Sequence, residues 1–99
     1  MRMIAVKILS DFYRHGAYRD CAGPLRAWYT LASVALWARP ADVVAQAPKA
    51  SILEDGRAVF NLGGNKYRLV VWIYYDHVTI YTRFIGTHAQ YDQIDAQTI

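Results

Sequence analysis

The sequence predicts an α+β fold of two layers: an antiparallel β-meander with an N-terminal strand, and a two-helix hairpin packed on one face of that sheet. Three apolar or alternating segments, at residues 58–62, 67–75 and 78–85, indicate the strands, because side chains of a strand alternate between two environments. Apolar residues spaced three and four apart in the first half of the chain indicate the helices.

Two turn signals, Gly63-Gly64-Asn65 and Asp76-His77, separate the three strand segments. Gly and Asn adopt positive φ at low cost, so both loops are expected to close antiparallel hairpins. The expected cross-strand partners are Asn61 with Arg68, Leu62 with Tyr67, Val70 with Arg83, Trp72 with Tyr81, Tyr74 with Thr79, and Tyr75 with Val78.

Alternation along these strands sorts their side chains onto two faces. One face is apolar and is expected to form the core; its members are Phe60, Leu62, Leu69, Val71, Ile73, Val78, Ile80 and Phe84. The other face is polar and aromatic; its members are Arg57, Asn61, Arg68, Trp72, Tyr74, Tyr81 and Arg83. A slip of one residue in either hairpin would exchange the faces.

The other elements follow from spacing and from proline. Residues 1–6 alternate weakly and are expected to form a short edge strand. Pro24 suits the first turn of a helix, and Pro40 requires that helix to stop by Arg39. The apolar stripe of this helix is Leu25, Trp28, Tyr29, Ala32, Ala35 and Leu36, and Trp37 is also expected in the core. The sequence further predicts a helix from Lys7 to Gly16, a helical turn at residues 41–46, a connector up to Glu54, and a final helix at residues 89–97 capped by Thr87.

Composition sets the class of protein. A length of 99 residues, of which 55% are hydrophobic, suits one domain over residues 1–99. The net charge of +3 permits a nucleic-acid partner without requiring one. Cys21 is the single cysteine, so an internal disulfide is ruled out and the thiol is expected to be buried and inert. With no targeting signal and no long apolar segment, a cytoplasmic protein without membrane contact is expected.

The polar sheet face combines Arg68, Arg83 and Asn61 with several aromatic rings. Guanidinium groups bind phosphate through paired hydrogen bonds, and rings stack on unpaired bases. The face therefore fits an RNA platform. It fits equally a solvated sheet face on which cross-strand aromatic pairs only stabilise the sheet.

Two segments beside this face also have two interpretations. The run from Gly63 to Lys66 either brings backbone N–H groups to a phosphate or is only a hairpin turn. His88, Tyr91 and Asp92 lie side by side if their segment is helical. His88 is then either a general acid or base, or a packing residue. The scattered histidines show no metal-ligand spacing, so no metal is expected.

Two motifs point to a family. F-N-x-G-G-N-x-x-R spans residues 60–68, and T-H-x-x-Y-D spans residues 87–92, with hydrophobic strand between them. Together they resemble the HigB toxins of the RelE/ParE-like superfamily of toxin–antitoxin systems. The order of elements is similar over essentially the whole chain, and the two-helix half matches in pattern only.

The resemblance implies a RelE-like fold and an mRNA interferase, an endoribonuclease that cuts messages on translating ribosomes without metal or cofactor. The 2′-hydroxyl of the message attacks the adjacent phosphodiester, leaving a cyclic phosphate and a 5′-hydroxyl. The resemblance also implies neutralisation by a HigA-type helix-turn-helix antitoxin in a toxin–antitoxin hetero-oligomer.

Residue roles follow from the same resemblance and from the chemistry of this reaction. Arg68 and Arg83 match the strand arginines of the superfamily and are expected to stabilise the phosphate charge. His88 is the candidate acid or base, with Tyr91 and Lys66 assisting. The remaining expected contacts to substrate or catalytic groups are Asn61, Asn65, Trp72, Tyr81 and Asp92.

One departure from the family pattern concerns lysine. RelE-type enzymes often use several lysines, whereas the meander carries Lys66 alone. ParE-like relatives share the fold and inhibit gyrase, so a non-catalytic binding toxin is the alternative function.

Overall fold

A five-stranded mixed sheet forms the centre of the computed structural model, which describes residues 1–99. The strands are β1 (Arg2–Ile4), β2 (Ser51–Ile52), β3 (Arg57–Leu62), β4 (Tyr67–Tyr74) and β5 (Thr79–Thr87), and their order is β1-β5-β4-β3-β2. The predicted meander is confirmed as β3, β4 and β5. The N-terminal strand is also confirmed at an edge, where it runs parallel to β5. β2 was not predicted, because a strand of two residues is too short to show an alternating pattern of side chains.

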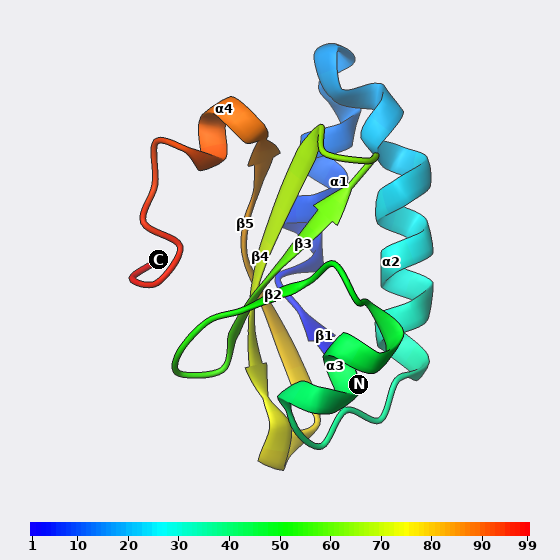
Figure 1. Cartoon of the computed structure of the whole chain (residues 1–99). Helices are drawn as coiled ribbons and strands as arrows, with labels where there is room; N and C mark the ends of the chain where they lie inside the picture. The colour runs from blue at the N-terminus through cyan, green and yellow to red at the C-terminus, as the bar shows by residue number, and fades with distance from the viewer.

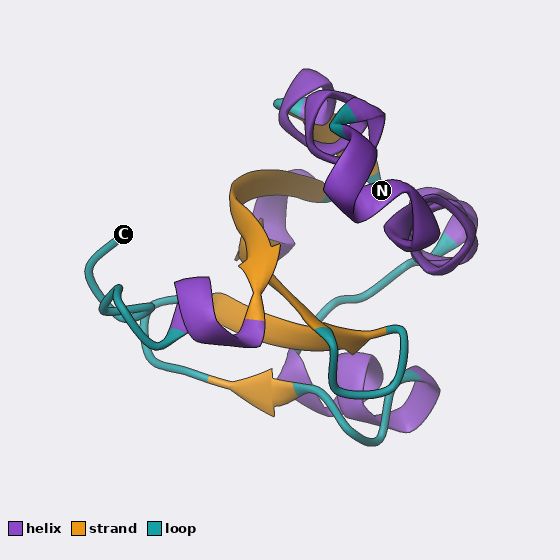
Figure 2. Ribbon diagram, turned by 90° about the horizontal axis from the view of Figure 1, so that it is seen from above, coloured by secondary structure: helices purple, strands orange, loops and turns teal.

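The helices are α1 (Val6–Arg14), α2 (Ala22–Val34), α3 (Pro40–Gln46) and α4 (His88–Tyr91), with 3-10 turns η1 (Gly16–Cys21) and η2 (Tyr75–His77). Figures 1 and 2 show α1 and α2 side by side over one face of the sheet, as the two-layer prediction requires. None of the helices has the length and apolar character needed to cross a membrane.

The second helix stops before Pro40, as expected, but the predicted place of Leu36 on its apolar stripe is wrong. α2 ends at Val34, and Leu36, which lies beyond this end, is 84% exposed. The extended chain after Val34 lets Trp37 turn inward, where it stacks on Phe60 at 6.1 Å between ring centroids and is only 2% exposed. Burial of an indole outweighs continuation of the helix, because a large aromatic side chain contributes about 2–3 kcal/mol when buried.

The main core lies between the helices and the sheet. β3 and β4 pair in the predicted register, with Asn61 opposite Arg68 and Leu62 opposite Tyr67. The inward side chains of the two strands are Ala58, Phe60, Leu62, Tyr67, Leu69, Val71 and Ile73, all of them buried. Their partners across the layer include Leu25, Trp28 and Ala32 of α2 and Leu9 of α1.

A β-bulge in β5 overturns two assignments. Val71 pairs with Thr82 and Val70 pairs with Phe84, so Arg83 is the inserted residue and is not the partner of Val70. An inserted residue reverses the faces beyond it. Phe84 therefore leaves the predicted core face for the opposite one, while Thr82 turns inward with its hydroxyl buried and without a hydrogen-bond partner.

The second hairpin loop is longer than predicted. Tyr74 pairs with Thr79 as expected, but η2 and Val78 form the connection, where only Asp76 and His77 were expected. Val78 takes a left-handed conformation, with φ of 50°, to reverse the chain after the 3-10 turn. It is 42% exposed instead of being in the core.

The C-terminal segment covers part of the sheet face that was predicted to be open. The final helix is α4 alone, shorter than the predicted 89–97, and the chain then runs back along the sheet (Figure 1). Residues of this segment pack on the outward side chains of the sheet in a second small core, formed by Val59, Val70, Ala96, Leu53, Phe84, Tyr91, Ile94 and Ile99. Gln97 fixes the segment by donating to the Glu54 carbonyl at 3.0 Å and accepting from its N–H at 3.1 Å.

Candidate functional site

The α4 site is a cluster of polar side chains where β3, β4 and β5 meet α4. Cross-strand pairing places Asn61 beside Arg68 and Arg68 beside Gly86, directly before the start of α4. The site thus gathers seven of the ten predicted residues, which are Asn61, Asn65, Lys66, Arg68, His88, Tyr91 and Asp92. Figure 1 shows α4 next to the β3–β4 loop at one end of the sheet.

A capping box starts α4 and fixes its direction. Thr87 accepts from the Gln90 N–H at 3.1 Å, and the Gln90 side chain accepts from the Thr87 N–H at 2.8 Å, which confirms Thr87 as the cap. Gln90 also donates to the Tyr18 hydroxyl at 3.1 Å. The N–H of His88 donates to the Lys66 carbonyl at 3.1 Å. α4 is therefore tied both to η1 and to the β3–β4 loop.

His88 and Asp92 form a pair on successive turns. His88 Nδ1 lies 3.1 Å from Asp92 Oδ2, so the predicted side-by-side placement is present. A carboxylate only accepts, so Nδ1 carries the proton in this contact. The Nε2 atom of a neutral His88 is then a free base, and both side chains are exposed to solvent.

Arg68 lies between the β3–β4 loop and α4. Its Nη1 donates to the Asn65 carbonyl at 3.1 Å, and its Cζ lies 6.0 Å from the Tyr91 ring centroid. Asn65 thus contributes its backbone. A guanidinium has five N–H groups in a planar fork, so Arg68 keeps donors for an anion beside α4.

Lys66 is engaged by a residue from the other half of the chain. Its ammonium forms an ion pair with Asp20 of η1, which also accepts from the Tyr67 hydroxyl. These bonds hold the pKa of Asp20 below its usual range and raise the pKa of Lys66. Burial, and then Asp20, raise the pKa of Tyr67. Lys66 is a charged cation held at the edge of the α4 site.

The other three predicted residues lie elsewhere. Trp72, Tyr81 and Arg83 line an open hollow of about 730 Å³ at the opposite end of the sheet. The full lining of this hairpin hollow is Arg2, Ile4, Trp72, Tyr74, His77, Thr79, Tyr81 and Arg83. Arg68 is paired with Gly86 of β5, and Arg83 lies three residues before Gly86, roughly 10 Å along that strand. The bulge and the C-terminal segment divide the predicted single platform.

Sequence reasoning missed the residues that support the α4 site from η1. Asp20 is 46 residues from Lys66, and Tyr18 is 72 residues from Gln90. No local pattern signals contacts over such separations. The spacing T-x-x-Q at residues 87–90 is the sequence signal for the Gln90 half of the capping box.

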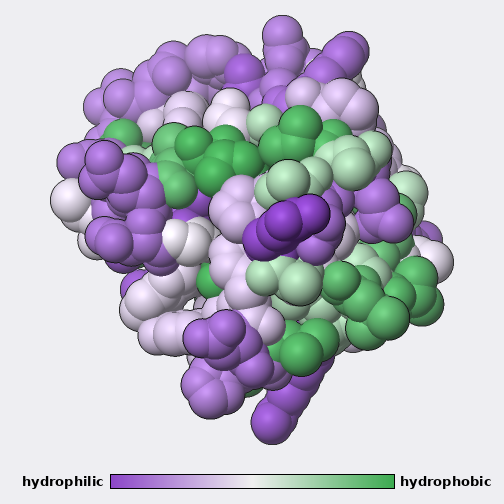
Figure 3. Space-filling view, turned by 60° about the horizontal axis from the view of Figure 1, so that its bottom comes forward, coloured by the Kyte–Doolittle hydropathy of each residue, from purple (hydrophilic) through white to green (hydrophobic).

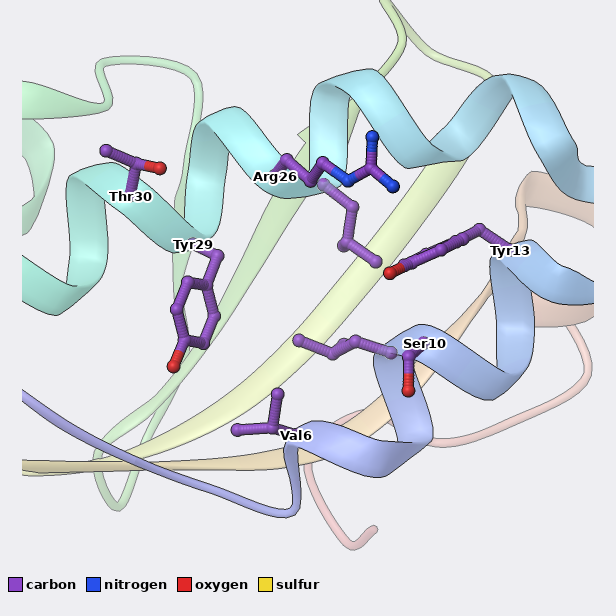
Figure 4. A pocket seen from close by; sticks show the side chains of 8 residues that line it. Val6, Ser10, Tyr13, Arg26, Tyr29 and Thr30 are labelled. Carbon is purple, nitrogen blue, oxygen red and sulfur yellow. The ribbon is translucent and has the colours of Figure 1, made fainter.

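A second hollow, of about 320 Å³, lies between α1 and α2 (Figure 4). It is mainly apolar, with Val6 and Tyr13 on one wall and Tyr29 on the other. Arg26 lies 5.5 Å from the Tyr13 ring centroid. No acid and base face each other there, so the α4 site remains the candidate reaction site. No three His, Cys, Asp or Glu side chains gather in a group that could hold a metal ion.

This five-stranded mixed sheet with helices packed on it is compatible with a RelE-like fold. The family model of the HigB toxins, the RelE-like toxic components of toxin–antitoxin systems, matches residues 21–94, and the chain belongs to this family. A search of curated proteins gave no match. As the toxic component of such a system, the chain has an antitoxin as its partner.

Proposed function

We propose that the chain is a ribosome-dependent mRNA interferase that cuts translated messages in the cytoplasm at the α4 site. The observation that carries this proposal is that Arg68, which keeps N–H donors free, lies next to Tyr91 of α4, the helix on which His88 and Asp92 form a pair. That combination supplies two of the groups that cleavage of RNA by its own 2′-hydroxyl requires, a base for the 2′-hydroxyl and a cation for the phosphorane.

The proposed cleavage moves its protons and bonds as follows. His88 Nε2 takes the proton of the 2′-hydroxyl as the 2′-oxygen bonds to phosphorus. The bond from phosphorus to the 5′-oxygen breaks, and a protonated group or water supplies the proton of the leaving oxygen. The products are a 2′,3′-cyclic phosphate and a 5′-hydroxyl. Asp92 holds the His88 tautomer that leaves Nε2 free.

The charges divide between the two cations of the site. Arg68 binds the reacting phosphate with the N–H groups that its contact with Asn65 leaves free. Lys66 adds positive charge at the rim, while its pairing with Asp20 keeps it from serving as a proton donor. Tyr91 supports Arg68, and Asn61 lies beside it to contact the ribose or phosphate.

The partner is proposed to be a HigA-type antitoxin with a helix-turn-helix domain, in a hetero-oligomer with the toxin. The unpaired charge of Arg68 in the α4 site favours an acidic antitoxin segment that covers or distorts the site. A complex in which the site stays free and undistorted would instead indicate neutralisation by exclusion from the ribosome.

The test is a map of transcript 5′ ends after brief induction, with and without ongoing translation. New ends within coding sequence that vanish when translation is blocked support the proposal. Ends that persist without translation indicate a free ribonuclease. Growth arrest with no new ends contradicts cleavage and favours a binding toxin of the gyrase-inhibitor type, which a DNA-damage response would then identify.

A further inference from the structure

The hairpin hollow holds positive charge that no acid of the protein neutralises. Arg2 and Arg83 line it, together with the exposed His77, and none of its lining residues is acidic. The ion pairs of the structure are Arg39 with Asp42, Lys66 with Asp20, and His88 with Asp92, so neither arginine takes part in one. Neither guanidinium donates a side-chain hydrogen bond within the protein. Unpaired guanidinium groups on one surface favour an anionic ligand.

Aromatic rings form the wall of the same hollow. Trp72 and Tyr74 lie 4.6 Å apart between ring centroids, and Tyr74 and Tyr81 lie 5.4 Å apart at a steep angle. Tyr74 is 37% exposed, and neither tyrosine hydroxyl has a hydrogen-bond partner in the protein. Trp72 is fixed by its donation to the Asp55 carbonyl at 2.6 Å and by Arg57 over its ring at 5.3 Å. Trp72 is therefore held through its own N–H, while the hydroxyl groups of Tyr74 and Tyr81 stay free.

The fold builds the hollow from three strands. β1 adds Arg2 opposite Thr79 and Ile4 opposite Tyr81, on the edge of the sheet. The bulge places Arg83, as the inserted residue, on the exposed surface of β5. Figure 3 brings the lower end of the molecule forward and shows hydrophobic and strongly hydrophilic residues next to one another on that face. A rigid aromatic wall with cations beside it has the chemistry of single-stranded nucleic-acid binding.

We propose that the hairpin hollow is a second RNA-contact surface, in which unpaired bases stack on Tyr74 and Tyr81 while Arg2 and Arg83 bind the phosphates between them. This inference rests on the proposed function, since the RNA is the message that the α4 site cuts. The hollow lies along β4 from Arg68, with Trp72 four residues, roughly 13 Å, away. The hollow therefore binds a part of the message at a distance from the phosphodiester that is cut.

The experiment measures fluorescence anisotropy of a labelled single-stranded 2′-O-methyl RNA, which lacks the nucleophile and stays intact. The variants are Arg2→Gln with Arg83→Gln, and Tyr81→Leu. Arg39→Gln is the control, because Arg39 is exposed and lies outside both sites. We expect the double arginine variant to bind more weakly and to lower the slope of log K against log salt by about 1.4. We expect Tyr81→Leu to weaken binding about tenfold. The control should bind as the parent does.

Three outcomes would overturn the inference. Equal binding by folded hollow variants and the parent would show that RNA does not contact this surface. An equal loss in the Arg39→Gln control would show only general charge attraction. Variants that bind RNA normally but lose the antitoxin would make the hollow a protein-docking surface. Each outcome is separate from the proposed cleavage, since the 5′-end map tests the α4 site without reference to oligonucleotide affinity.

Discussion

Asp20 and Lys66, far apart in sequence, form an ion pair that joins η1 to the loop between β3 and β4. Asp20 also accepts from Tyr67, which is buried at the start of β4. The same stretch of η1 supports α4 through the bond between Tyr18 and Gln90. The N-terminal half of the chain thus holds the loop and the helix that carry the candidate catalytic groups.

Asp20→Asn should lower stability at neutral pH and change its acid dependence. Its pKa is lowered from the ordinary 3.8 by the bonds from Lys66 and Tyr67. The contribution to stability is therefore complete above the unfolded pKa and is lost as pH falls through the folded pKa. We expect the Tm difference between the parent and Asp20→Asn to shrink below about pH 4.

The matched control for this change is Asp11→Asn. Asp11 is exposed on α1 and makes no side-chain hydrogen bond or ion pair. Thermal unfolding followed by circular dichroism between pH 2 and pH 8 gives both series. A constant Tm difference for Asp20→Asn across this range would contradict the role of the carboxylate.

Arg68→Ala should slow cleavage strongly while leaving the fold intact. Arg68 lies on the outward face and makes no ion pair, so its removal costs little packing. Loss of a preorganised donor to a transition-state charge lowers rates about 100- to 1,000-fold. The rate of message cutting on purified ribosomes checks this, with Arg39→Ala as the control. Cutting by Arg68→Ala at the parental rate would show that the phosphate is bound elsewhere.

His88→Ala should slow cleavage about 100-fold or more, as expected for loss of a general acid or base. Asp92→Asn should give a smaller loss, because the asparagine removes the carboxylate that orients His88 Nδ1 but keeps the ring. Added imidazole distinguishes a reacting histidine from a packing residue. Partial recovery of cutting by His88→Ala in imidazole supports a reacting histidine. No recovery, together with a shifted Tm, supports a packing role.

Gly86→Ala should destabilise the protein and displace α4. A Cβ at Gly86 would lie 2.6 Å from Phe84 Cζ and 2.8 Å from Gln90 Oε1. The Phe84 ring belongs to the second core and Gln90 to the capping box, so neither moves freely. Overpacking of this kind costs about 1–3 kcal/mol. Urea unfolding measures the cost, and the cleavage rate reports whether His88 moves with α4.

Gly23→Ala is the control for this substitution. Nothing lies within 4 Å of a Cβ built at Gly23, which is in α2. Alanine there should leave stability unchanged or raise it by up to about 1 kcal/mol. Equal unfolding free energies for Gly86→Ala and the parent would show that the side chains of Phe84 and Gln90 move aside without loss of stability.

The thiol of Cys21 should resist alkylation in the folded protein. Cys21 is 0% exposed, and burial raises the pKa of its thiol to about 11. Because the thiolate is the nucleophile, very little reactive form exists at pH 8. We expect slow labelling by iodoacetamide in buffer and rapid labelling in guanidinium chloride. Rapid labelling without denaturant would contradict the buried position.

Features set by neighbours in sequence were predictable. The first hairpin has the predicted register because Gly63 and Gly64 take positive φ at its tip. Thr87 caps α4 because its partner, Gln90, is three residues away. His88 and Asp92 meet because one helical turn separates them. These placements depend on a few consecutive dihedral angles, which local residue types govern.

Features set by distant contacts were not predictable. The bulge at Arg83 depends on how β5 fits both β4 and the core, and no residue type signals it. It separates Arg83 from Arg68 and turns Phe84 outward, onto the segment that ends in Ala96 and Ile99. Leu36 lies outside α2 because the chain leaves the helix after Val34 and packs Trp37 on Phe60. In each case the free energy of burial is gained between segments that are remote along the chain.

The sequence by itself determined the order of helices and strands, the two-layer class, the family motifs and most members of the α4 site. Only the tertiary structure decided that Lys66 is paired with Asp20. It also decided that the predicted polar and aromatic face is divided between the α4 site and the hairpin hollow. Periodicity and turn chemistry are encoded within a few residues. A bulge, an ion pair between halves of the chain and a covering C-terminal segment arise only when the whole chain is packed.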